Sequence, residues 1–171
     1  MGTYPGGMIV RVTPTLSESA YTALDVLFNP TEVKNAVSSR GGVSALTAMF
    51  VVDYKNVSDT DARFIFTEGN TDFGTINATA NISTDNIKAN KVIGTALWSQ
   101  TAATTATGID NARVHQVLQS FGTSEYSSPM MLVQAAAGSR SIYVSGLLAS
   151  STTPTYDADS IELIMHFKYL G

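Results

Sequence analysis

The sequence contains no cysteine and few charged residues. Of its 171 residues, ten are Lys or Arg and 14 are Asp or Glu, so charged residues make up only 14% of the chain. Without cysteine, neither disulfide bonds nor thiolate metal sites can form. An average soluble domain has about 25% charged residues, and here small polar residues and alanine take their place. Such a surface has few charges to desolvate, which suits stable contact with neighbouring subunits.

Basic clusters and long apolar runs are also missing. The net charge is −4, and no two of the ten Lys and Arg residues are adjacent. Nucleic acids and anionic membranes select basic patches, and a membrane-spanning helix needs roughly 20 apolar residues. The start, MGTYPGGMIV, lacks the basic and apolar regions of a secretory signal. We therefore expect a soluble protein that is made in a cytoplasm, with no nucleic-acid partner and no membrane partner.

No set of side chains in the sequence matches a known catalytic motif. The two histidines, His115 and His166, lie on the more polar phase of strand-like segments, and neither adjoins a nucleophile motif. The Asp-x-Asp pairs at 59–61 and 157–159 offer oxygen ligands to Ca²⁺. Aspartates in turns, however, more often bind their own backbone. We expect a protein that is not an enzyme and that holds no metal or cofactor.

The clearest structural signal is a period of two near the end of the chain. Apolar residues occupy every second position from 161, and more polar residues mostly fill the positions between them. This pattern is typical of a β-strand with one face in a core and one face mostly in water. The face predicted to be buried consists of Ile161, Leu163, Met165, Phe167 and Tyr169.

Similar alternation predicts eight to ten short strands with turn signals between them. The fold class expected from this pattern is all-β, an antiparallel β-sandwich or jelly roll. One short helix is expected at 83–90, because Ser83 is a good N-cap. Residues 99–110 have no period and are expected to be a loop. Strands are predicted at 8–13, 23–28, 31–37, 43–56, 62–69, 91–98, 129–138, 141–150 and 161–169. The segment 112–121 fits a strand or a helix, and a strand is favoured because its neighbours are strands.

Three local features refine this prediction. The strand at 43–56 is apolar on both phases, which is typical of a central strand covered on both sides. The turn residues VSDTD after it predict a hairpin with 62–69, and Gly138-Ser-Arg predicts a second hairpin between 129–138 and 141–150. The pair Asn29-Pro30 is expected to be a turn. The two phases of the central strand are Leu46, Ala48, Phe50, Val52 and Tyr54, and Val43, Ala45, Met49 and Val51.

The expected domain organisation is an N-terminal arm at 1–7 followed by one β-sandwich domain at 8–171. The arm, MGTYPGG, contains three glycines and one proline, so we expect it to be flexible when no partner is bound. On a partner it can become ordered along an exposed edge or groove. We therefore predict that Tyr4, Pro5 and Met8 contact a partner, with Tyr4 as the aromatic anchor.

The two ends of the domain also resemble a known family. The opening RVTPTLSESAYTALDVLF, the stretch STDNIKANKVIG and the ending IYVSGLLASSTTPTYDADSIELIMHFKYLG are similar to small virion proteins of tailed bacteriophages. The similarity is carried by Ser17–Val26 and Pro154–Phe167, and it does not extend over 99–128. Within that family the best match is to capsid decoration, or cement, proteins.

The resemblance implies a function and a location. Decoration proteins bind the outer surface of the assembled head and clamp major capsid subunits together, often as homotrimers at three-fold positions. The main alternative is another virion component, a neck, tail or head-fibre protein. A further alternative is a carbohydrate-binding or hydrolytic module, which would need an exposed aromatic platform around Trp98. Copy number per virion separates the first two alternatives.

Overall fold

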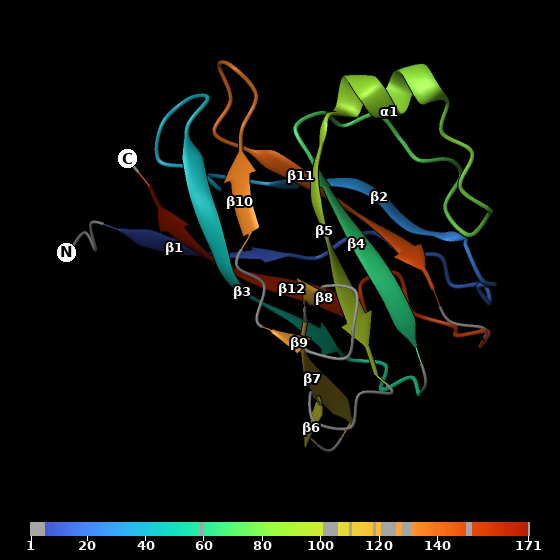
Figure 1. The fold of residues 1–171 in the computed structure, drawn as a ribbon. Coiled ribbons are helices and arrows are strands. Elements are labelled where there is room, and N and C mark those ends of the chain that lie inside the picture. Colours follow the sequence, from blue (N-terminus) through green and yellow to red (C-terminus); the bar gives the residue numbers. More distant parts are fainter. Residues whose placement is uncertain are drawn as a thin grey trace.

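The fold consists of two main β-sheets and one short helix (Figure 1). The computed structural model of the chain describes residues 6–58, 60–100, 106–109, 111–117, 119–120, 126–127, 131–149 and 152–170. The larger sheet has the order β1 (Gly7–Val12), β12 (Ile161–Tyr169), β3 (Val43–Asp53), β7 (Ala112–Gln116) and β6 (Ala106–Ile109), and β10 (Met131–Gln134) also pairs with β3. The smaller sheet has the order β2 (Val26–Val33), β11 (Ile142–Leu148), β4 (Asp61–Thr67) and β5 (Val92–Ser99). A short ladder joins β8 (Gln119–Ser120) to β9 (Tyr126–Ser127), and α1 spans Thr84–Asn90.

The strand order is that of a jelly roll. Two groups of four strands, β1-β12-β3-β10 and β2-β11-β4-β5, form the two layers, and all their ladders are antiparallel. Among these eight strands, the chain changes sheet at every connection except the one between β4 and β5. Strands β6 to β9 lie between β5 and β10 in the sequence and form an insertion. The prediction of an antiparallel sandwich or jelly roll with one short helix is confirmed.

The core between the two layers is rich in aromatic side chains. Phe64 on β4 stacks on Trp98 of β5 with ring centroids 6.2 Å apart, and Phe28 of β2 lies 6.0 Å from Phe64. Leu46, Met49 and Val51 of β3 meet them from the larger sheet and are fully buried. This packing, rather than disulfides, holds the layers together.

Strand β12 has the predicted phase. Ile161, Leu163 and Met165 are fully buried, and Phe167 is nearly so. Tyr169 is half-buried, and its hydroxyl donates a hydrogen bond to the carbonyl oxygen of Asn35 at 3.0 Å. The strand lies between β1 and β3, so both of its edges are hydrogen-bonded.

Strand β3 departs from both predicted phases before Thr47, that is, at Val43, Ala45 and Leu46. Leu46 was expected on the same side as Ala48 and Phe50, but it is buried in the core beside Met49 and Val51. The cause is a β-bulge: His166 pairs with Ala48 while the next residue, Phe167, pairs with Leu46, so Thr47 is the extra residue. A bulge adds one residue to one strand and thereby reverses the alternation of side chains.

The predicted hairpin between 43–56 and 62–69 is wrong, because β3 and β4 belong to different sheets. The connection is a corner organised by Asp53, the last residue of β3. Its carboxylate accepts hydrogen bonds from the backbone N–H groups of Lys55, Asn56 and Val57 at 2.9–3.0 Å. Asn56 has a positive φ of 55°, which turns the chain toward the other layer. The turn residues were recognised correctly, but they redirect the chain between sheets.

The second predicted hairpin, between 129–138 and 141–150, is wrong for the same reason. Strand β10 pairs with β3, whereas β11 lies between β2 and β4 in the opposite sheet. Gly138 has a φ of 85°, and the N–H of Ser139 donates to the carbonyl oxygen of Ala136 at 2.9 Å. A tight turn is therefore present, but it joins the two layers of the sandwich.

Asn29 and Pro30 do not separate two strands, as predicted, but lie inside β2. The ladder between β2 and β11 is irregular here, and β2 is an edge strand. Proline, which lacks an N–H, is tolerated at edges and bulges. The Asn29 side chain completes the edge by donating to the carbonyl of Gly74 at 2.7 Å and accepting from the N–H of Phe73 at 2.9 Å.

The helix prediction is confirmed, and the loop prediction is wrong in part. Helix α1 has Ser83 as its N-cap, and the Ser83 hydroxyl accepts a hydrogen bond from the N–H of Asn86 at 3.2 Å. In the segment 99–110, residues 106–109 form β6, which pairs with β7. The sequence of this short strand does not alternate. Its conformation is determined by pairing with β7, so the sequence pattern did not reveal it.

Gly146 on β11 is required by close packing within the smaller sheet. A Cβ at this position would lie 2.5 Å from the ring of Phe28, which pairs with it across the ladder. We expect Gly146→Ala to lower the free energy of unfolding by about 1–3 kcal/mol, because the Phe28 ring must shift within a full core. Urea denaturation measures this change. Ser145→Ala is the matched control, since the buried Ser145 hydroxyl has no hydrogen-bond partner among the described residues and its loss should cost little. Equal stability of Gly146→Ala and wild type would contradict this account.

Candidate functional site

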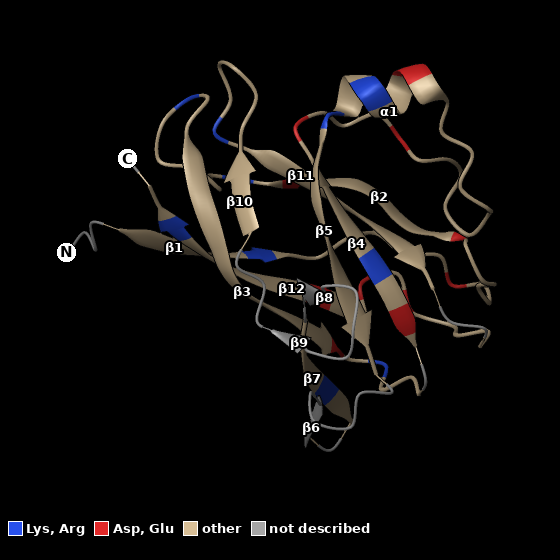
Figure 2. Cartoon of the chain, in the orientation of Figure 1, with Lys and Arg blue, Asp and Glu red and all other residues tan. Residues whose placement is uncertain are grey.

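The outer face of the larger sheet carries an apolar surface at its centre. Ile9 of β1 pairs with His166 of β12, which in turn pairs with Ala48 of β3. In the next row, Arg11 of β1 pairs with Ile164 of β12, which pairs with Phe50 of β3. Ile9 is 59% exposed, and Ile164, Ala48 and Phe50 are half-buried. Figure 2 shows that β3 is uncharged along almost its whole length. We call this surface the outer apolar face and define it as Ile9, Ala48, Phe50, Val52 and Ile164.

Polar groups border the outer apolar face. On one side, Arg11 and Glu162 form an ion pair at 2.9 Å, and the exposed Tyr54 donates its hydroxyl hydrogen to Glu162 at 3.1 Å. Toward the other side, the His166 ring packs against Phe50 with centroids 5.6 Å apart. An apolar centre with a polar border is the usual anatomy of a protein–protein contact.

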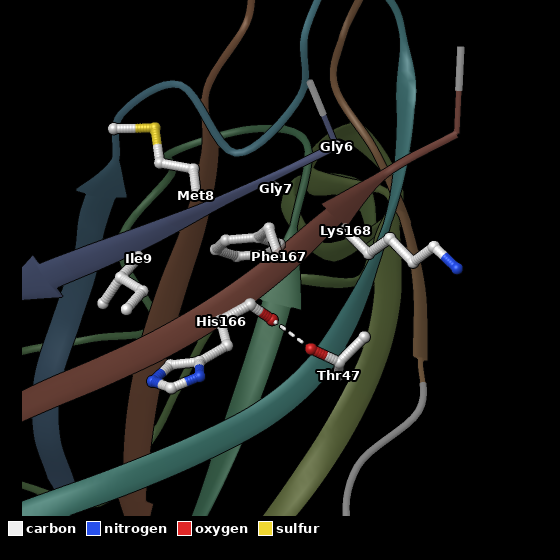
Figure 3. A pocket seen from close by; sticks show the side chains of 8 residues that line it. All are labelled: Gly6, Gly7, Met8, Ile9, Thr47, His166, Phe167 and Lys168. Atoms are coloured by element: carbon white, nitrogen blue, oxygen red, sulfur yellow. Dashed lines mark hydrogen bonds between the residues drawn. The ribbon is translucent and has the colours of Figure 1, made fainter. Parts of the chain in front are cut away.

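A shallow groove of about 550 Å³ lies at the N-terminal end of β1, where β1 pairs with the C-terminal end of β12 (Figure 3). At Gly6 no heavy atom lies within 4 Å of the position that a Cβ would occupy, so this residue leaves the groove open. The Thr47 hydroxyl donates to the carbonyl oxygen of His166 at 3.1 Å and fixes the bulge. The groove is lined by Gly6, Gly7, Met8, Ile9, Thr47, His166, Phe167 and Lys168.

Of the three predicted partner-binding residues, only Met8 lies within the described part of the chain. It is half-buried in β1, packs against the core, and has its sulfur 3.2 Å from the Tyr169 hydroxyl oxygen. It also lines the groove, with its side chain on the opposite side of β1 from Ile9 (Figure 3). Tyr4 and Pro5 lie outside the described residues, so their contact with a partner stays a prediction. Strand β1 begins at Gly7, the last residue of the predicted arm and one residue before the predicted start of the strand.

His115 was expected on a polar face, but it is fully buried. It pairs with Val51, a core residue of β3, and its ring meets Trp98 edge-on with centroids 5.7 Å apart. Burial lowers the pKa of His115 below its usual value, and the nearby charge of Arg113 lowers it further. His166, by contrast, lies on the outer face as predicted. The alternation in 112–121 did not predict this burial, because β7 turns the phase that contains His115 toward the core.

The tryptophan and the aspartate pairs take structural positions. Trp98 is fully buried and cannot serve as an exposed platform for sugars. Asp61 accepts a hydrogen bond from the N–H of Gln100, and Asp157 forms an ion pair with Lys55 at 2.8 Å. Asp59 lies outside the described residues. Within the described ranges, no group of three or more His, Asp or Glu residues is placed to hold a metal ion, and no helix has the length and apolarity to cross a membrane.

Comparisons with known proteins add little. No protein-family model matches the chain, and no curated protein matches it in sequence. Two solved structures are weakly similar. The unassembled VP1 pentamer of a mutant Washington University polyomavirus is 11% identical, over 98% of this chain and 70% of that chain, with a TM-score of 0.16. The VP1 pentamer of KI polyomavirus is 10% identical, over 94% and 66%, with the same TM-score. Similarities of this size carry no argument about this protein.

Proposed function

We propose that the protein is a capsid decoration protein of a tailed bacteriophage, which binds the outer surface of the assembled head and clamps major capsid subunits together. The proposal has no catalytic step and needs no cofactor. It rests first on the resemblance carried by Ser17–Val26 and Pro154–Phe167. Both segments contribute to the core, where Tyr21 and Tyr156 meet edge-on with centroids 6.3 Å apart.

The observation that carries the proposal beyond resemblance is the outer apolar face. A sandwich already buries the inner face of each sheet, so apolar residues on an outer face are unusual unless a partner covers them. In this proposal a second copy of the chain covers the face and builds a homotrimer. The rigid ladders of β1, β12 and β3 keep the surface in one shape, which lowers the entropy lost on association.

The N-terminal arm supplies the second contact. Its last two residues, Gly6 and Gly7, line the groove at the border of the outer apolar face. A trimer that presents three arms engages several capsid subunits at once, so weak single contacts add up to firm attachment. Because the trimer binds only the assembled lattice, it stabilises the head by mass action.

A neck, tail or head-fibre protein is the second candidate, since the same fold and surface serve any contact within a virion. The two differ in stoichiometry. A protein that binds the head lattice is present in hundreds of copies per particle, and a neck or tail protein in a few. Quantitative mass spectrometry of purified virions measures this number, and a count near a dozen would replace the decoration proposal with the second candidate. A sugar-binding role has less support, because Trp98 is buried.

Deletion of Met1 to Pro5 should separate folding from attachment. The backbone of β1 begins at Gly7 and would keep its pairing with β12, so we expect a thermal midpoint within about 2 °C of wild type. Binding to heads that lack the protein should weaken at least tenfold, because Tyr4 is lost as an anchor. Cosedimentation with such heads measures the binding, and Tyr4→Ala in the full chain is the narrower test. Unchanged binding of both variants would exclude the arm from attachment while leaving the decoration proposal open to the copy-number measurement.

A further inference from the structure

His115 and Trp98 bring three unpartnered polar atoms together inside the core. The exposed fraction of each residue is zero, and their rings meet edge-on at 5.7 Å. Neither ring nitrogen of His115, nor Nε1 of Trp98, has a hydrogen-bond partner among the described residues. Most buried polar groups in proteins are paired, so this cluster costs stability and calls for a reason.

Among the described residues packed around His115, no carboxylate is free to receive its proton. On β7 itself the charged neighbour is Arg113, which repels a second positive charge. On β3, Asp53 is committed to the corner at 54–57 and to the Gln100 amide at 3.4 Å. At the start of β4, Asp61 accepts from the N–H of Gln100. Strands β5 and β6 carry no charged residue. A proton on His115 would therefore be a buried positive charge without a partner.

The consequence for stability has a definite sign. An unperturbed histidine takes up a proton near pH 6.5. In the folded protein burial opposes this uptake, so the pKa of His115 is lowered, whereas the unfolded chain binds the proton freely. Stability is complete above about pH 6.5 and falls as the pH decreases, because the unfolded or locally open state binds more protons. The ratio of open to closed molecules rises by up to tenfold for each pH unit.

We propose that His115 is an acid-sensitive latch that holds strand β7 against the sandwich only while its imidazole is neutral. Mild acid opens the latch at β7, because β7 pairs with only the last four residues of β3 and has the short β6 as its other neighbour. The eight-stranded sandwich lies outside this opening. The inference does not depend on the proposed role on a phage head.

The chain is suited to a direct test, because Trp98 is its only tryptophan and His115 and His166 are its only histidines. Wild type, His115→Leu and His166→Gln are titrated from about pH 7.5 to about pH 5, the range in which histidine changes charge. Trp98 emission and the thermal midpoint are recorded at each pH. In wild type and His166→Gln we expect the emission to shift to longer wavelength and the midpoint to fall below about pH 6.5. In His115→Leu both changes should be lost or strongly reduced.

Two outcomes would overturn the latch. One is an equal pH response in wild type and His115→Leu, and the other is loss of the response in His166→Gln. If His115→Leu does not fold, wild type with isotope-labelled histidine rings is followed by NMR instead. A His115 ring that is half-protonated near pH 6.5 in the folded state, with no change in Trp98, would overturn the latch as well.

Discussion

Met165→Asp is expected to prevent folding. Met165 is fully buried in the central strand β12 and lies in register between Val10 of β1 and Met49 of β3, which are also buried. Removing the methionine forfeits about 1.5–3 kcal/mol of apolar burial. Placing a carboxylate there adds a penalty of several kcal/mol, because no Lys or Arg is among the buried residues that the structure describes. The sum is comparable with the ~5–15 kcal/mol of stability of a typical domain.

The soluble fraction after expression and far-UV circular dichroism measure this outcome. Met165→Leu is the matched control, since a swap of similar volume in a core usually costs less than about 1.5 kcal/mol. We expect Met165→Leu to be soluble and folded and Met165→Asp to be insoluble or unfolded. Soluble Met165→Asp with a thermal midpoint near that of wild type would mean that β12 presents its other face to the core.

Ile164→Lys is expected to leave a folded protein that no longer self-associates. Ile164 is the immediate neighbour of Met165, but it points to the outer apolar face, where it lies between Arg11 and Phe50. A lysine there keeps its charge in water in the monomer and would be buried without a partner in the trimer. Wild type should therefore have three times the 18.1 kDa chain mass, about 54 kDa, and the variant the mass of one chain.

Light scattering coupled to size-exclusion chromatography, at several concentrations, measures the two masses. Ile65→Lys is the control, because Ile65 is half-buried on the outer face of the smaller sheet, in register with Ser145 and Thr95. The control should remain a trimer. If wild type is a monomer both in solution and when bound to heads, or if Ile164→Lys remains a trimer, the outer apolar face is not the subunit contact.

The strands could be predicted from the sequence wherever one face of the strand is buried and the other faces solvent. In β12 the alternation gave both the strand and its phase, and in β1 it gave the strand, because burial of alternate residues imposes a period of two. At Thr47 the same rule failed, since a bulge depends on the pairing with β12 and leaves no local signal in the sequence. The sequence also did not show which strands pair with each other. The turn residues at 54–60 and 135–141 identify where the chain turns, but not whether it returns to the same sheet.

The residues of the candidate site also differ in whether local sequence pattern could reveal them. Ile9, Phe50 and Ile164 were identifiable as apolar residues on a second phase, and the structure places them on one surface. The groove was not identifiable, because its lining comes from β1, β3 and β12, which meet only in the folded sheet. The burial of His115 also depends on tertiary structure, since β7 belongs to an insertion whose orientation on the core has no local cause.

The position of β12 between β1 and β3 has a consequence for the kinetics of folding. Strand β3 ends at Asp53, and the strand that joins it to β1 begins only at Ile161. During synthesis, β1 and β3 therefore emerge from the ribosome with no neighbour for the edges that β12 will occupy. Loop closure over such sequence separations is slow, and unpaired edges invite contacts with other chains. We therefore expect the pairing of β12 with β1 and β3 to limit the rate of folding, and low temperature or low chain concentration during expression to favour the native protein.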